Sequence, residues 1–231
     1  MAATTDVKKE KRGFSDVLTD FIQRNRRGLL IAVIALVVIV IGFIAGYAIR
    51  SSLREKANSV VEDFSQRYEV LVIDLNEPEK AEDVKTLLDE LVAFADKTSG
   101  YAGARAYSLA ASIHAEQKNW ASAESAWRNS AKKAGNSYMA PASLFNAAVA
   151  AEEQGNLDQA VELYAESAAH VSGFPAAARA QFEIGRLRES QGDTQAALEA
   201  YKLIPEKWSG ESTWINLAQS RIILLSNTES Q

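Results

Sequence analysis

The stretch that decides the fold covers residues 155–164, which read GNLDQAVELY. Two other stretches share its pattern: residues 118–127 read KNWASAESAW, and residues 192–201 read GDTQAALEAY. In each stretch an alanine stands four positions before an aromatic residue, and the pair recurs every 37 residues, at 123/127, 160/164 and 197/201. A fixed period of this size is typical of stacked helical hairpins, in which each repeat packs on its neighbours.

The positions of the repeat suit a helical hairpin. Gly155 and Gly192 fit the tight turn between two helices, where the backbone needs a positive φ angle. The alanine that follows lets the second helix approach the first, and the aromatic residue on the same face fills the space between repeats. In the first helix Ala111, Ala148 and Gly185 recur with the same period, which indicates close packing there too.

This pattern resembles the tetratricopeptide repeat. The match is good around Gly155, fair around Gly192, and looser around Lys118, which stands where a turn glycine is expected. The 37-residue period exceeds the usual length of about 34 residues, and an extra helical turn would absorb the difference. The resemblance implies an α-solenoid whose first helices line a concave face.

The composition agrees with an all-α fold and narrows the chemistry. Alanine is frequent, whereas Gly and Pro number only 12 and 4, and alanine favours helix. Cysteine is absent, which excludes disulfides, Cys-ligated zinc and a thiol nucleophile. Two histidines, His114 and His170, leave little material for a metal site, and no GxSxG, HExxH, P-loop or GxGxxG motif occurs. We expect no catalytic residues, no metal and no cofactor.

Residues 28–49 read GLLIAVIALVVIVIGFIAGYAI, an uncharged run long enough to cross a bilayer as a helix. A cleaved signal peptide is the alternative, but its apolar region is only about 7–15 residues long, so we expect an uncleaved anchor. Residues 1–27 carry a net charge of +3 and the remainder −8. Because positive flanks stay in the cytoplasm, we expect an N-terminus inside the inner membrane and a periplasmic body. The acidic body disfavours nucleic acid as a partner.

The expected layout is an all-α chain with one transmembrane helix, then a tetratricopeptide-like α-solenoid with a C-terminal capping helix. Its parts are a cytoplasmic tail with a short amphipathic helix (1–27), the transmembrane helix (28–49), a helical linker with N-terminal helices (50–98) and the repeat domain (99–227). We expect the membrane helix to run to about residue 74, with a break near residues 76–78. The further expected helices are 79–96, 101–117, 120–133, 138–154, 157–171, 175–191, 194–204 and 211–226. The last of these is the capping helix, and its packed face is expected to carry Trp214, Leu217, Ala218, Ile222 and Leu225.

The whole chain is similar to the YfgM-like family, on two stretches. Residues 21–28 read FIQRNRRG and lead directly into the anchor, and residues 101–123 run from YAGARA to KNWASA. The resemblance implies an ancillary factor of the Sec translocon and the periplasmic chaperone network. Implied partners are translocon subunits, chaperones or exported polypeptides. A scaffold for envelope biogenesis or cell division, and a ligand-binding receptor or enzyme, are alternatives, and a homo-oligomer stays open.

The concave face of such an array is where partner segments usually bind. Mapping the repeat onto this geometry predicts a groove that carries basic and apolar residues, which suits an acidic or amphipathic ligand. The predicted partner-binding residues are Arg105, Ser108, Ser112, Phe145, Val149, Glu152, Arg179, Phe182 and Arg186. A second interpretation has equal weight for the two phenylalanines, which would then be buried between helices.

Overall fold

The computed structural model describes residues 13–72, 78–170 and 173–228, and the chain divides into two units between Glu55 and Lys56. The described residues form helices joined by short turns, with no strand among them. The all-α prediction is therefore confirmed. The tail of residues 1–12 and most of the expected break near residues 76–78 lie outside the described part of the chain.

Helix α1 (Phe14–Val72) contributes to both units. Its part in the first unit contains a stretch that is long and apolar enough, by length and composition, to cross a membrane. Side chains of this stretch are not covered within the unit: Phe43, for example, is 79% exposed. A helix in the core of a soluble domain would have these side chains buried, so this stretch of α1 is a candidate membrane span.

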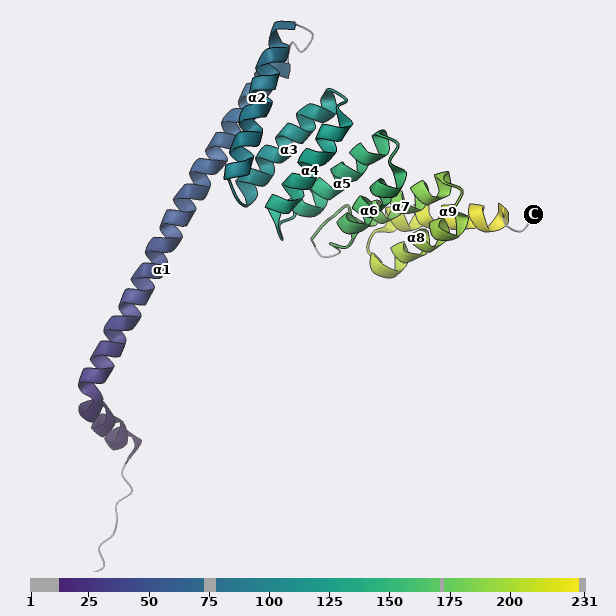
Figure 1. Ribbon diagram of the computed structural model, residues 1–231. Coiled ribbons are helices and arrows are strands. Elements are labelled where there is room, and N and C mark those ends of the chain that lie inside the picture. Colours follow the sequence, from purple (N-terminus) through teal and green to yellow (C-terminus); the bar gives the residue numbers. More distant parts are fainter. Residues whose placement is uncertain (1–12, 73–77, 171–172, 229–231) are drawn as a thin grey trace, which may run out of the picture. The chain divides into compact units, whose positions relative to one another are not determined.

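The second unit is an array of antiparallel helices that pack in chain order (Figure 1). After the last part of α1, its helices are α2 (Pro78–Lys97), α3 (Tyr101–Glu116), α4 (Trp120–Ala134), α5 (Met139–Glu153), α6 (Leu157–Ala168), α7 (Ala177–Ser190), α8 (Thr194–Lys207) and α9 (Ser212–Thr228). The helices of the repeats end within three residues of the predicted bounds, because the 37-residue pattern marks each turn. In the tetratricopeptide comparison, α3, α5 and α7 are the first helices, and α4, α6 and α8 the second.

The turns inside the hairpins share one backbone conformation. Gly155 and Gly192 have φ angles of 77° and 78°, as predicted. Lys118, which stands at the same position of the first repeat, also adopts a positive φ of 57°. Left-handed backbone costs a residue with a side chain about 1 kcal/mol or more, and two backbone hydrogen bonds offset it here: Lys118 N–H donates to the carbonyl of Ala115 at 2.9 Å, and Asn119 N–H to the carbonyl of His114 at 2.8 Å. Side-chain caps from Asn119 and Asp193 then begin the second helices of two hairpins.

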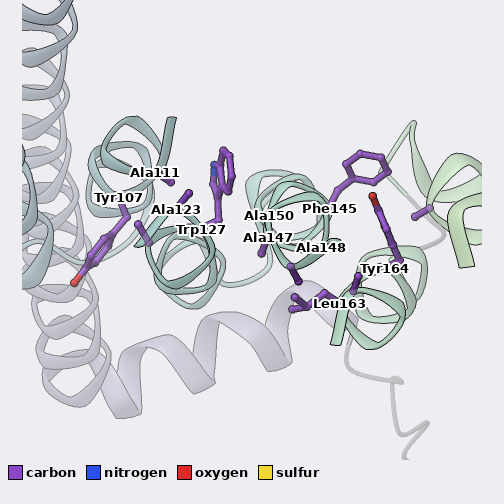
Figure 2. Close-up of a cluster of buried hydrophobic side chains, with 14 of the residues drawn as sticks. Tyr107, Ala111, Ala123, Trp127, Phe145, Ala147, Ala148, Ala150, Leu163 and Tyr164 are labelled. Carbon is purple, nitrogen blue, oxygen red and sulfur yellow. The ribbon is translucent and has the colours of Figure 1, made fainter. Parts of the chain in front are cut away.

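The repeated alanines and aromatic residues form the core, as the sequence predicts (Figure 2). Ala123, Ala160 and Ala197 have no exposed surface. Tyr164 and Tyr201 are among the largest fully buried side chains, and each ring packs on a phenylalanine of the first helix of its own hairpin, Tyr164 on Phe145 at 5.1 Å and Tyr201 on Phe182 at 5.2 Å. Close approach of the helices thus depends on alanine, and the aromatic ring fills the volume between the two helices of its hairpin.

A buried serine makes a second repeated contact, a hydrogen bond between the two helices of a hairpin, which was not predicted. The Ser130 hydroxyl donates to the carbonyl oxygen of Ala104 at 2.8 Å, and 37 residues later the Ser167 hydroxyl donates to the carbonyl of Pro141 at 2.8 Å. Both serines are fully buried. Each ties a second helix to the beginning of its first helix, so a buried polar group is satisfied and the pairing of the two helices is fixed.

The last part of α1 and α2 form another helical hairpin before the recognisable repeats. Val61 of α1 packs in the same core as Leu87 and Leu91 of α2, and all three are almost fully buried. The Phe64 and Phe94 rings meet edge to face at 5.7 Å between centroids. The array thus begins within α1, inside the segment of residues 50–98 that was expected to hold a helical linker and N-terminal helices.

At the opposite end, α9 covers the third hairpin only in part. Ala218 is fully buried, and Trp214, Ile222 and Leu225 pack against the core, as expected of a capping helix. Leu217 differs from the prediction: it was expected on the packed face but is 43% exposed. The reason is helical geometry, since a 100° step per residue places Leu217 beside the packed stripe and not within it.

Candidate protein-binding groove

A groove of about 370 Å³ lies between the last part of α1 and the first helices α3 and α5. Three of the predicted residues, Arg105, Ser108 and Ser112, line it together, one turn apart on α3. Its other lining residues are Val61, Ser65, Tyr101, Leu109, Tyr138, Met139, Ala142, Ser143 and Asn146. The walls thus combine small hydroxyl side chains, an amide, two phenols and one guanidinium, with an apolar floor.

Arg105 supplies the positive charge among these lining residues. Its Nη2 atom lies 3.4 Å from Oε2 of Glu62, and both side chains keep substantial contact with solvent. At this distance and exposure an ion pair contributes little, within about 1 kcal/mol. Several guanidinium N–H groups therefore remain available to a carboxylate or carbonyl that enters the groove.

Two tyrosines form the rim of the groove and were not predicted. The hydroxyl oxygens of Tyr101 and Tyr138 lie 3.2 Å apart, and the ring centroids are 6.4 Å apart. This hydrogen bond, followed by partial burial, raises the pKa of Tyr101. Both rings are exposed, and the two residues are 37 positions apart, so the same period that located the core could have found them.

At the neighbouring junction, between α5 and α7, ion pairs connect the two helices. Nη2 of Arg186 donates to both carboxylate oxygens of Glu152, at 2.8 and 2.6 Å, and its Nε donates to Glu183 at 2.6 Å. Two predicted groove residues, Glu152 and Arg186, are therefore engaged with each other. The predicted surplus of positive charge is not present there, because the guanidinium is matched by two carboxylates.

Phe145 lies in the core at this junction. It is 8% exposed, and its ring meets Tyr164 edge to face at 5.1 Å, with the two rings pointing toward each other in Figure 2. Arg179 covers the outer side of the ring, with its guanidinium carbon 4.9 Å from the centroid, and also lies 3.6 Å from Glu183. Burial between helices, the second interpretation, thus describes Phe145. Val149, on the same helix, is partly buried against the core.

Phe182 occupies the equivalent position one repeat later and is only partly buried. Its ring packs on Tyr201 at 5.2 Å and on Trp214 at 5.5 Å. A second hollow, of about 440 Å³, lies beside it and is bounded by Arg186 and Arg221. Arg221 is paired in turn with Glu189, Nε to Oε2 at 3.0 Å.

The first helices are thus linked by ion pairs at three junctions of the array: α1 to α3 through Glu62, α5 to α7 through Glu152, and α7 to α9 through Glu189. The α3 to α5 junction has no ion pair among the described residues, and there the groove lies. No group of three or more metal-ligating side chains is present in the described part of the chain.

Comparison with known proteins agrees with this architecture. A tetratricopeptide-repeat family model matches residues 108–171 and 145–212. A TPR repeat-containing protein of Treponema pallidum (strain Nichols) is 31% identical over 234 residues, which cover 94% of this chain and 96% of that protein. Two crystal structures of a Podosopora anserina kinesin light chain-type protein with nearly identical TPR-like repeats, one of them a point variant, are 18% identical, with TM-scores of 0.52 and 0.53. They cover 74% of this chain and 89% and 88% of theirs, and at this identity they support the fold alone.

Proposed function

Because the chain belongs to the tetratricopeptide-repeat proteins, whose arrays are scaffolds for protein–protein interaction, we propose that it binds a polypeptide segment in the groove between α1, α3 and α5. The observation that carries the proposal is the contrast along the first helices. Arg105 lines an open groove, and its ion pair with Glu62 is long and exposed to solvent. Arg186, in contrast, is bound by two carboxylates.

The chemistry of the groove selects an extended segment with an acidic side chain. Ser108, Ser112 and Asn146 offer hydrogen-bonding groups to a peptide backbone, and Arg105 offers N–H donors to a carboxylate. A volume of about 370 Å³ accommodates a few side chains. A ligand helix, about 10 Å across with its side chains, needs a broader channel.

The proposal places the groove outside the cytoplasm. The apolar stretch of α1 is the anchor in the inner membrane, the basic residues that precede it keep the tail in the cytoplasm, and the array lies in the periplasm. A partner in this location is a Sec translocon subunit, a periplasmic chaperone or an exported polypeptide. The protein would then act as an ancillary factor that passes newly translocated chains to chaperones.

The topology can be tested with thiol labelling, because the chain has no cysteine of its own. Ser125→Cys places a thiol on the exposed side of α4, and Thr4→Cys places one in the tail. A membrane-impermeant maleimide is expected to label the first in cells with a permeabilised outer membrane. It should reach the second only after the inner membrane is opened, and the opposite order would overturn the orientation.

The binding proposal is tested by photo-crosslinking in cells. A photoreactive amino acid replaces Ser108 inside the groove, and the matched control replaces Ser125 on α4, a serine outside it. We expect translocon subunits or periplasmic chaperones to be captured from position 108 only. Capture of cell-division or wall-synthesis proteins would favour the scaffold of envelope biogenesis, and equal capture from both positions would exclude the groove as the binding surface.

A further inference from the structure

Helix α9 takes the place of the first helix of a further repeat. Two contacts establish its register. Arg179 of α7 covers Phe145, and Trp214 of α9 covers Phe182, which is 37 residues further on. In the second contact, Arg186 of α7 binds Glu152, and Arg221 of α9 binds Glu189, again 37 residues further on. Both pairs align α9 with α7 at an offset of 35 residues.

This register identifies the face of α9 that would receive a second helix. On α7 that face carries Gly185, Gln181 and Phe182. A Cβ atom on Gly185 would come within 2.5 Å of Tyr201, the Gln181 amide donates to the carbonyl of Ala200 at 3.1 Å, and Phe182 packs on Tyr201. All three therefore contact α8.

The corresponding residues of α9 are Ser220, Asn216 and Leu217, and all three are exposed. Ile223, further along the same face, is 62% exposed. The small residue that permits close helix approach is thus retained at position 220, with nothing from the described chain packed on it. The Ser220 hydroxyl already donates to the carbonyl of Asn216 within its own helix at 2.9 Å, so its burial would leave no unsatisfied donor.

Four residues of this face are placed symmetrically about Ser220, whereas Asn216 corresponds to Leu224, which is 55% exposed. Leu217 and Ile223 lie three positions to either side of it, and Thr213 and Asn227 lie seven positions to either side. An antiparallel helix with the same sequence, crossing at Ser220, places Leu217 against Ile223 and Thr213 against Asn227 in both directions. Such self-complementarity is what a two-fold interface between identical chains requires.

The distribution of charge also favours a second copy of the chain as the partner of this face. The face has no ionisable residue at positions 213, 216, 217, 220, 223 or 227, although the chain beyond residue 27 carries a net charge of −8. Elsewhere two copies of so acidic a body repel each other. On this face, two copies meet without opposing charges.

We infer that the exposed face of α9, defined by Thr213, Asn216, Leu217, Ser220, Ile223 and Asn227, binds the same face of a second copy in an antiparallel two-fold pair. This surface is separate from the groove, so the inference does not depend on the proposed function. One helix pair buries less area than the roughly 1,200 Å² of a stable interface. The pair is therefore expected to exchange quickly and to be trapped better by a covalent bond than by chromatography.

The full chain, in the membranes of the cells that produce it, is used for the test. Ser220→Cys places the only thiol of the chain at the crossing point, and mild oxidation is expected to give a disulfide-linked species of twice the chain mass. Ser125→Cys, an exposed serine on α4, is the matched control and should remain monomeric. Equal dimer from the two variants would overturn the inference. A disulfide adduct of Ser220→Cys with a different protein would overturn the choice of a second copy.

A charge exchange tests the antiparallel register. Leu217→Glu in the Ser220→Cys chain brings a carboxylate against Ile223 of the other copy, and loss of the disulfide dimer is expected. Co-expression of this chain with one carrying Ile223→Lys and Ser220→Cys should restore a mixed dimer, because glutamate then meets lysine. Both substitutions lie on an exposed face, so the helical circular dichroism and the melting temperature should stay unchanged. Failure of the mixed pair to form would exclude this register.

Discussion

The α3/α5 and α5/α7 junctions are built on the same repeat, yet one is open and the other is filled. The reason is seen when each residue that fills the α5/α7 junction is compared with the residue 37 positions before it. Phe145 corresponds to Ser108, and Arg179, which covers its ring, corresponds to Ala142. Ser108 and Ala142 both line the groove. The groove therefore exists because two large side chains of one junction are replaced by two small ones in the other.

The ion pair follows the same rule. Glu152 and Arg186, which close α5/α7, correspond to Ala115 and Val149 at α3/α5. The backbone period is thus kept, while the side chains between first helices decide whether a junction serves stability or binding. The following predictions test this division and are ordered by their expected effect on the free energy of unfolding.

The largest effect is expected for Phe145→Ala. Phe145 is 8% exposed and packed against Tyr164, so its removal leaves a cavity and should lower the free energy of unfolding by about 3 kcal/mol or more. Urea unfolding of the purified chain followed by circular dichroism measures the change. Ser112→Ala, a change inside the groove, is the control and should unfold like the unmodified protein. A Phe145→Ala chain of unchanged stability that no longer captures its partner would return Phe145 to the binding surface.

A second effect, of about 2 kcal/mol, is expected for Gly185→Ala. A Cβ atom at this position would come within 2.5 Å of the Tyr201 ring, which is fully buried and has no space to move. One repeat earlier, Ala148 occupies the same position without exposed surface, so only the third hairpin requires glycine there. Gly210→Ala is the matched control, since nothing lies within 4 Å of a Cβ atom at Gly210. Equal melting temperatures for the two variants would contradict the close approach of α7 and α8.

These two sites also show what sequence reasoning could reach. The helix bounds, the turn glycines and the buried Ala/aromatic pairs all follow the 37-residue period, and each was predicted. Placing Phe145 requires a different kind of information, because the period identifies a face of the helix but not which side chain of the next helix covers it. Arg179, which covers Phe145, has no counterpart in the preceding repeat, where Ala142 stands.

The ion pairs between first helices could not be predicted from the repeat pattern, for a related reason. Their partners are separated by 43, 34 and 32 residues, and none of these intervals equals the period. Long charged side chains reach across a junction at whichever helical turn faces them, so the interval varies with the length of each connection. Arg105, Ser108 and Ser112 line the groove together, and their grouping could be predicted because one-turn spacing depends on a single helix; that they bind a partner stays a prediction.

Replacing the arginine of each junction by alanine should lower the free energy of unfolding by different amounts, neither more than about 1 kcal/mol. Arg186→Ala removes the cation between Glu152 and Glu183 and leaves Glu183 with Arg179 alone, but the Arg186 side chain is 42% exposed, so solvent screening limits the loss of stability to about 1 kcal/mol. Arg105→Ala breaks a single pair at 3.4 Å and should cost less than about 0.5 kcal/mol. Urea unfolding at low and high salt measures both, and the difference between the variants should shrink with salt. A larger loss for Arg105→Ala would mean that the groove arginine serves mainly the fold.

A change in stability no larger than that of Arg186→Ala, with the largest change in binding, is expected when the closed junction is copied onto the open one. Ser108→Phe with Ala142→Arg gives α3/α5 the ring and the covering guanidinium of α5/α7. The new side chains enter a groove of about 370 Å³, so the free energy of unfolding should change by less than about 1 kcal/mol. Photo-crosslinking from Asn146, which lines the groove, should then no longer capture the partner.

Tyr138→Phe provides the matched control for this transplant, because it alters the rim of the groove without filling it and breaks only the hydrogen bond to Tyr101. Capture from Asn146 should persist in that chain. If the filled chain still captured the partner as well as the control, the openness of α3/α5 would be incidental, and the binding surface would have to lie elsewhere on the array. If capture is lost while the unfolding curve stays in place, two small residues at one junction distinguish a binding repeat from a structural one.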